Sequence, residues 1–331
     1  MTISSEPTGN RIPARKKRVP VHGVLLLDKP AGLSSNDALI RAKRLLNAEK
    51  AGHTGTLDPF ATGLLPLCFG EATKFAQDLL DADKTYLAEV RLGARTSTGD
   101  IEGEVLERID CQVSRAQVDE VLTRFRGQIE QMPPMYSALK RDGKPLYAYA
   151  RAGITVEREM RSVTIHQLDL LDLEGEVLTL RVRCSKGTYI RVLGEDIGAA
   201  LGCGAHLQAL RRTEVGRLRL EQAITLEALA EHDEAQRVAC LAPVDALLSG
   251  FPEVRLPAAL AQRLLQGQRL ALQQEGVALP AAGRVRVYRD DTGVFLGSAL
   301  LHAHGVLAPE RLVATGQAVG ATLLPTGKPL K

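Results

Sequence analysis

Apolar residues fall into short runs and helical stripes that alternate with turn signals along the chain. The run 22–28 predicts a buried strand, and the stripe after it predicts a helix to about residue 46, capped by Ser35 or Asn36. We expect further strands at 86–92, 162–173, 177–184, 206–213 and 215–220, and further helices at 72–80, 114–125, 188–201 and 226–231. This alternation predicts an α/β (α+β) domain around a mixed sheet.

The pattern changes at residues 248–252, where Leu-Ser-Gly-Phe-Pro interrupts regular structure. Beyond this point, 285–288 and 294–300 predict a strand pair, and 312–314 predicts a third short strand. We therefore expect a large domain over 21–250, a small β-rich domain over 251–315 and a flexible tail over 316–331.

The stretch 130–160 departs from the alternation, because prolines and glycines interrupt it. Basic residues are interleaved there with three of the six tyrosines of the chain, Tyr136, Tyr147 and Tyr149. Charge for phosphates and rings for bases are what recognition of single-stranded or loop RNA requires. A helical hairpin whose tyrosines pack on the core explains the same residues, so the pattern alone leaves both interpretations open.

Composition adds little except at the N-terminus. The 331 residues are 45% hydrophobic and 24% charged, as in an ordinary globular protein, and the formal net charge is +3. Five basic residues against one acidic residue fall within 1–20, so the rest of the chain is close to neutral. We expect 1–20 to be a flexible basic arm, which serves either as a solubilising tail or as a source of phosphate contacts.

The five cysteines form no C-x-x-C pair and their number is odd, which predicts neither a disulfide framework nor a zinc site. Such usage is typical of reduced thiols in a cytoplasm. The N-terminus lacks the apolar stretch of a signal peptide, and no window approaches a membrane span. We expect a cytoplasmic protein without membrane or metal partners, and a monomer, because no surface stripe indicates self-association.

The octapeptide 52–59, Gly-His-Thr-Gly-Thr-Leu-Asp-Pro, is the strongest candidate for chemistry. Its glycines permit close backbone approach or positive φ, and Pro59 biases Asp58 toward an extended conformation. A loop of this kind can present the Asp58 carboxylate to a ligand. An isolated Asp-Pro is more often a turn, so the octapeptide as a whole carries the signal.

This octapeptide closely resembles the motif that carries the catalytic aspartate of the TruB family of tRNA pseudouridine synthases. Further family signatures follow in order at 23–30, 32–35, 70–75, 83–86, 134–140, 184–191, 203–207 and 210–212. The resemblance spans roughly residues 22 to 250. It implies the pseudouridine synthase fold, a mixed and mostly antiparallel sheet flanked by helices, with a thumb-like RNA-binding insertion at about 130–160. It also implies a PUA-like RNA-binding domain at 251–315.

The activity implied is isomerisation of the T-loop uridine at position 55 of tRNA to pseudouridine. The N1–C1′ bond breaks, the uracil turns, and C5 joins C1′, with no redox step or energy input, so no cofactor is expected. Asp58 either adds to C6 of the ring or acts at C1′, and the sequence does not decide between them. An ionised carboxylate shielded from water needs a cationic partner, and the resemblance implies Arg191.

Because the target uridine lies in a folded loop, the enzyme must flip it out of its stack. The resemblance implies that Tyr86 stacks on the uracil and assists proton removal from C5. Tyr189 packs beside the base, and His53 takes up the vacated space. A lone His or Tyr is more often structural than functional, so each of these roles depends on its matching motif.

The resemblance also assigns residues around the base and the RNA stem. Leu210 lines the apolar side of the pocket, and Lys29 supports the site from the end of the first strand. In the thumb-like insertion, Tyr136, Lys140 and Lys144 contact the RNA.

Two other functions use some of the same features. A tRNA-binding folding chaperone would need the same grip, with turnover incidental, but it has no need for a buried carboxylate such as Asp58. A glycosidase or nucleosidase acting on small molecules would normally need a second catalytic carboxylate. Neither Asp28 nor Glu71 lies in a loop that obviously qualifies.

Overall fold

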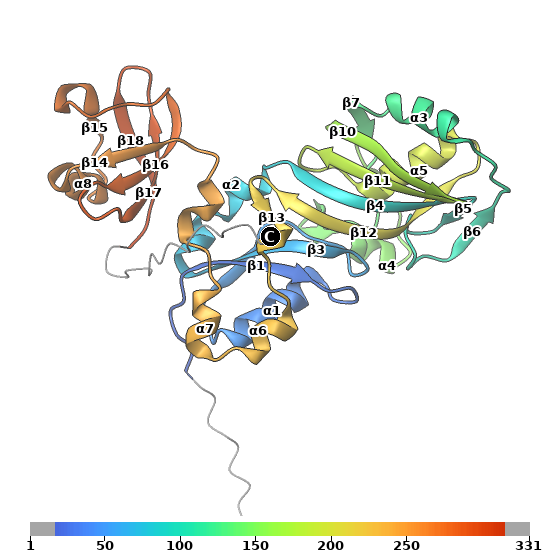
Figure 1. Ribbon diagram of the computed structural model, residues 1–331, viewed down its shortest axis with the longest axis horizontal. Helices are drawn as coiled ribbons and strands as arrows, with labels where there is room; N and C mark the ends of the chain where they lie inside the picture. Colours follow the sequence, from blue (N-terminus) through green and yellow to red (C-terminus); the bar gives the residue numbers. More distant parts are fainter. Residues whose placement is uncertain (1–16, 315–331) are drawn as a thin grey trace, which may run out of the picture.

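Residues 17–314 are described by a computed structural model, so most of the predicted N-terminal arm and the predicted tail at 316–331 lie outside the described residues. Two large sheets organise the described chain: a nine-stranded sheet before residue 250 and a five-stranded sheet after it, with two small hairpins beside them. The five-stranded sheet, orange to red in Figure 1, stands beside one end of the larger sheet.

The main sheet is mixed and mostly antiparallel, as predicted. Its path runs through β1 (Gly23–Lys29), β3 (Thr62–Phe69), β12 (Ala205–Val215), β4 (Lys84–Leu92), β11 (Val177–Cys184), β10 (Arg161–Glu174) and β7 (Gly127–Gln131). The short strands β2 (Ala51–His53) and β13 (Leu218–Arg219) pair with β3 and β12. Among the described strands of this sheet, only β3 and β12 pair in parallel. Their contact requires a glycine, because a Cβ at Gly63 would meet the Arg212 backbone oxygen at 2.3 Å.

Helices cover the apolar face of this sheet. In β4 and β11 alternate residues are buried, and the buried set joins one core cluster with α3 (Arg115–Thr123) and α5 (Ile190–Ala200). At the other end, α1 (Ser35–Leu45) and α6 (Leu226–Glu231) pack beside β1, and α7 (Glu234–Ala239) follows α6 (Figure 1). A small hairpin, β5 (Ala94–Thr96) with β6 (Val105–Arg108), extends from the end of β4.

The start of α1 differs from the prediction in a way that matters for the site. The N-cap is Ser34, whose side chain accepts a hydrogen bond from the backbone of Asp37, and not Ser35 or Asn36. The buried Ser35 hydroxyl accepts from the Leu57 backbone N–H at 2.8 Å and donates to the Leu57 carbonyl at 3.0 Å. Ser35 therefore fastens the helix to the loop that carries Asp58.

Three other predicted elements have different limits. The segment predicted as a helix over 72–80 begins as a 3-10 helix at 70–75 and becomes α2 only at Ala76–Leu80. Helix α5 starts at Ile190 because Tyr189 is extended. The single strand β12 continues to Val215, and the left-handed Gly216 turns the chain into the two-residue β13.

The insertion at 130–160 contains a short β-hairpin and one short helix, so the helical hairpin considered from the sequence is not formed. Strands β8 (Lys140–Arg141) and β9 (Lys144–Pro145) meet at Asp142-Gly143, both with positive φ, and α4 (Leu146–Arg151) follows. Tyr136 and Tyr147 are 38% and 41% exposed, so these two rings are not packed into the core.

The C-terminal sheet has its own apolar core. Its strands lie in the order β14 (Glu253–Leu256), β16 (Gly283–Arg289), β17 (Phe295–Leu301), β18 (Val306–Leu312) and β15 (Leu270–Ala271), and α8 (Ala258–Leu265) packs beside them. The strand pair predicted at 285–288 and 294–300 is confirmed as β16 and β17. The third strand is 306–312 rather than 312–314, and β14, α8 and β15 were not predicted.

Aromatic and charged contacts join this sheet to the helical segment 70–80, which follows β3. The rings of Phe75 and Phe295 lie 5.6 Å apart, and Asp78 on α2 forms an ion pair with Arg284 on β16. Between residues 17 and 314, no helix has the length and apolar character needed to cross a membrane.

We predict that Leu65→Ala in the middle of β3 lowers the free energy of unfolding by about 2–5 kcal/mol, because it leaves a cavity in the core between helices and sheet. Urea unfolding followed by circular dichroism measures the change. Val105→Ala, at an exposed apolar position on β6, is the matched control and should shift stability by less than about 0.5 kcal/mol. Equal effects of the two substitutions would contradict the assignment of Leu65 to the core.

Candidate active site

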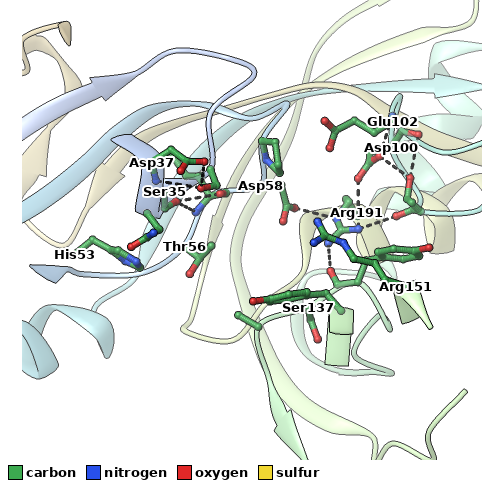
Figure 2. A pocket seen from close by; sticks show the side chains of 18 residues that line it. Ser35, Asp37, His53, Thr56, Asp58, Asp100, Glu102, Ser137, Arg151 and Arg191 are labelled. Carbon is green, nitrogen blue, oxygen red and sulfur yellow. Dashed lines mark hydrogen bonds and ion pairs between the residues drawn. The ribbon is translucent and has the colours of Figure 1, made fainter. Parts of the chain in front are cut away.

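A cavity of about 580 Å³ opens beside the loop between β2 and β3. Five segments line it: the start of α1, the Asp58 loop, the turn between β5 and β6, the insertion, and the start of α5. Figure 2 shows the side chains of Asp58 and Arg191 pointing toward one another across its centre. Segments more than 130 residues apart in the chain thus meet at one site.

The Asp58 loop is held in place by its backbone. The N–H of Gly32 donates to the Pro59 carbonyl at 2.8 Å, and the N–H of Ala61 donates to the Asp58 carbonyl at 3.2 Å. Leu57 is buried in the core, and both its backbone N–H and its carbonyl are hydrogen-bonded to the Ser35 hydroxyl. The Asp58 side chain, by contrast, remains 35% exposed, so the loop is fixed while its carboxylate faces the cavity.

Arg191 is the central cation of the site. Its side chain is 4% exposed, and its Nε lies 3.0 Å from Oδ2 of Asp58. Nη1 lies 3.4 Å from Oδ2 of Asp100 and donates to the Thr98 carbonyl at 2.8 Å. Nη2 donates to the Tyr136 carbonyl at 2.6 Å. Arg191 is therefore not a solvated surface residue, and partners from three segments fix the plane of its guanidinium.

Burial raises the pKa of the Asp58 carboxyl above its usual 3.8, and the neighbouring Asp100 acts in the same direction. The guanidinium of Arg191 and the charge of Lys29 oppose this shift, but the effect of burial is larger and the pKa stays raised. Glu102 lines the same cavity, and burial raises the pKa of its carboxyl. The negative charges of Asp100 and Asp58 act in the same direction. Asp58 is thus a more basic carboxylate than one in water, held beside a cation that it shares.

Lys29 does not line the cavity, but its side chain holds the backbone next to the Asp58 loop. It is fully buried at the end of β1, and its Nζ donates to the carbonyls of Pro30, Leu33 and Pro59 at 2.9, 2.7 and 3.3 Å. Burial lowers its pKa from 10.5 to about 8, although the charge of Asp58 acts in the opposite direction. All three of its donors are used to hold the backbone around Asp58.

His53 lines the cavity at the end of β2, as Figure 2 shows. Burial, and then the positive charge of Arg212, lower its pKa, so the ring is neutral at pH 7. Arg212 is one of the largest fully buried side chains among residues 17–314, and it donates to the Leu64 carbonyl at 2.8 Å. It places a fixed positive charge beneath the loop that carries Asp58.

Three of the predicted base-contacting residues do not line the cavity. Tyr86 and Leu210 are buried on neighbouring strands β4 and β12 within the main core. Tyr189 precedes α5, where its N–H donates to Oε1 of Gln131 at 3.0 Å. Burial raises the pKa of both phenols, so each is a protonated hydrogen-bond donor at neutral pH.

The insertion contributes aromatic and basic groups to one wall. Tyr136, Tyr147 and Arg151 line the cavity, and the Arg151 guanidinium lies 5.4 Å from the centre of the Tyr147 ring. Lys140 and Lys144 are exposed on β8 and β9 and lie outside the cavity lining. The structure thus places the predicted RNA-contacting residues on two parts of the insertion.

Sequence reasoning missed Asp100, Thr98 and Glu102, which reach the site through the turn between β5 and β6. Ser-Thr-Gly-Asp at 97–100 is a turn pattern that gives no indication of what the turn faces. Only the three-dimensional contact with Arg191 identifies it. Among residues 17–314, no group of three His, Cys, Asp or Glu side chains is arranged to hold a metal ion.

Comparison with protein-family models finds three consecutive matches. Residues 43–190 match the TruB family pseudouridylate synthase N-terminal domain. Residues 191–249 match the tRNA pseudouridylate synthase B C-terminal domain, and 252–313 match the pseudouridine synthase II TruB C-terminal domain.

Related proteins agree with these matches. The chain is 65% identical over 306 residues to tRNA pseudouridine synthase B of Burkholderia lata, covering 91% of this chain and 94% of the relative. It is 63% identical over 306 residues to tRNA pseudouridine synthase B of Ralstonia nicotianae, covering 91% and 96%. A solved Cbf5–Nop10–Gar1 complex contains a chain of similar fold, with a TM-score of 0.69 and 27% identity over 88% of this chain and 84% of that one.

The fold and these similarities define a pseudouridine synthase. More particularly, the chain belongs to the TruB family. The resemblance inferred from the motifs is confirmed.

We predict that Lys29→Met removes a pH-dependent part of the stability. In the wild type, folded Lys29 loses its proton near pH 8 while the unfolded chain keeps it to about 10.5. The free energy of unfolding should therefore rise by about 3 kcal/mol across that interval, relative to the variant. Urea unfolding at a series of pH values measures the difference.

Lys50→Met is the control, because Lys50 is exposed and should keep the wild-type pH dependence. Parallel profiles for the wild type and Lys29→Met would contradict the depressed pKa of Lys29.

Proposed function

We propose that this protein is a tRNA pseudouridine synthase that isomerises the T-loop uridine at position 55. The observation that carries the proposal is the pair Asp58–Arg191, a cavity-facing carboxylate 3.0 Å from a buried and fixed guanidinium. It occurs in a chain 65% identical to a protein named tRNA pseudouridine synthase B. The name of this relative supports tRNA as the substrate, and we propose that the tRNA is bound through its T-arm.

In the proposed reaction Asp58 acts as an ionised carboxylate. It assists cleavage of the N1–C1′ bond, either by adding to C6 or by acting at C1′, before C5 joins C1′. Arg191 keeps the carboxylate charged and oriented, since its other contacts, with two backbone carbonyls and Asp100, hold it in place. Such preorganisation costs no rearrangement when the reaction occurs.

The surrounding residues suit a flipped base. His53 and Tyr136 line the cavity, and a neutral imidazole can fill a space in an RNA loop without a second charge. Tyr86 is buried on β4 and does not line the cavity, so its contact with the uracil as the base enters is a role that we propose from the family resemblance. We assign Tyr189, which precedes α5, and Leu210 on β12 to the same contact with the base.

The two alternative functions fit less well. The cavity does contain further carboxylates, Asp100 and Glu102, which a glycosidase could use. Asp100, however, is 3% exposed and paired with Arg191, so it is placed to position the cation and not to reach a glycosidic bond. A folding chaperone would not need the pair Asp58–Arg191 at all.

We predict that Asp58→Asn abolishes turnover, by roughly a thousandfold or more, while tRNA affinity changes little, because the amide keeps the size of the side chain. Release of tritium from C5-labelled uridine in an unmodified tRNA transcript measures turnover, and filter binding measures affinity. The matched control is Asp37→Asn, since Asp37 also lines the cavity but bonds only the start of α1. Tritium release by Asp58→Asn at the wild-type rate would refute the proposed role.

The raised pKa of Asp58 predicts the acid limb of activity. Because only the ionised form acts, the single-turnover rate should fall as pH drops through a value above the 3.8 of an ordinary aspartate. Single-turnover tritium release across an acidic pH series, on protein shown by circular dichroism to stay folded, measures that limb. A midpoint at or below 3.8 would contradict the electrostatics described here.

We also propose that the exposed lysines of the insertion bind RNA phosphates. The double substitution Lys140→Ala with Lys144→Ala should lower the slope of log affinity against log salt by about 0.7 to 0.9 for each phosphate that is no longer neutralised. Arg124→Ala, at the exposed C-cap position that follows α3, is the control and should leave the slope unchanged. An unaltered slope in the double variant would exclude phosphate binding by these lysines.

A further inference from the structure

Two cysteines that the proposed reaction does not use lie against each other. The Sγ atoms of Cys111 and Cys203 lie 2.7 Å apart, closer than two unbonded sulfur atoms normally approach. This separation is about 0.7 Å longer than a disulfide bond of ~2.05 Å. Cys111 is half-buried and Cys203 is 4% exposed, and both are reduced.

Backbone hydrogen bonds through Gly93 hold the two cysteine segments together. The N–H of Gly93 donates to the Gly204 carbonyl, next to Cys203, at 3.0 Å. The carbonyl of Gly93 accepts from Ile109, two residues before Cys111, at 2.9 Å. A side chain at Gly93 would crowd this bridge, because a Cβ there would lie 3.0 Å from the Ile109 carbonyl and 3.6 Å from Cβ of Cys111.

We propose that Cys111 and Cys203 are an oxidation site that closes to an intramolecular disulfide in the presence of a hydroperoxide. The sulfur of one thiolate attacks the peroxide oxygen and becomes a sulfenic acid, and the peroxide leaves as water or an alcohol. The second sulfur then attacks the sulfenic sulfur, the S–S bond forms, and water leaves. In total the two thiols lose two electrons and two protons, and these reduce the peroxide.

The geometry restricts this reaction to one pair. Cys68 and Cys184 are buried, and Cys240 is half-buried in the segment after α7. Among the described residues, only Cys111 and Cys203 form a sulfur–sulfur contact. Burial, followed by the neighbouring thiol, raises the pKa of Cys111 to about 12. The first step is therefore slow at neutral pH, and the second is fast because the partner is already in place.

The disulfide would join two elements that hold Arg191. Cys111 follows β6, in the hairpin whose turn supplies Thr98 and Asp100, and Cys203 follows α5, whose first turn supplies Arg191. A bond across 92 positions of sequence would restrict the unfolded chain strongly. We expect oxidation to raise the thermal unfolding midpoint and to leave tritium release within about twofold, because both sulfurs lie at the far ends of these elements.

The test uses the full-length protein treated with hydrogen peroxide while folded, then unfolded in denaturant so that every remaining thiol is alkylated, digested and analysed by mass spectrometry. We expect two of the five thiols to become resistant to alkylation and a linked peptide pair containing Cys111 and Cys203, which disappears on reduction. Cys240→Ser, which removes the other half-buried thiol, should still form the link. Cys111→Ser and Cys203→Ala should not form it, and their unfolding midpoints should not rise with peroxide.

Five alkylatable thiols after peroxide treatment of folded protein would overturn the proposal. So would oxidation that stops at sulfenic or sulfinic acid, or a link between any other pair. The result does not depend on catalytic activity, so it stands apart from the outcome for Asp58→Asn.

Discussion

The ion pair between Asp58 and Arg191 is the interaction on which the rest of the site depends. A carboxylate removed from water costs free energy unless a cation is held beside it, and here the cation is itself buried. Three further acceptors, Asp100 and two backbone carbonyls, are therefore required to hold the guanidinium. The position of the insertion and of the β5–β6 turn follows from this requirement, because each supplies at least one of those acceptors.

Beneath the ion pair, two further positive charges are buried among backbone carbonyls. Lys29 and Arg212 both donate to such carbonyls, and they share the side of the sheet on which the Asp58 loop rests. Backbone carbonyls solvate these cations as water would, and the cations in turn fix the carbonyls. The loop thus owes its shape to buried charge and to the hydroxyl of Ser35, rather than to apolar packing alone.

The sequence predicted most of the main sheet, because its strands have clear apolar alternation, and it predicted Asp58, Arg191 and His53 through family motifs. It could not predict that Ser34 rather than Ser35 caps α1, since both are good caps and only the contact with Leu57 distinguishes them. It also missed Asp100, because a polar turn has no periodicity that indicates which residue the turn will contact. Local signals identify elements and motifs, whereas pairings between distant segments require the folded chain.

The parallel contact of β3 with β12 has a consequence for how the molecule is made. Residues 62–63 bond residues 211–212, so the floor of the site is completed only after some 150 further residues have been added. During synthesis, the loop that holds Asp58 leaves the ribosome long before the strand and the guanidinium that will fix it. Contacts of this sequence separation form late, because a long loop must close first. The surroundings that fix the reactive carboxylate are therefore completed only after β12 has been added.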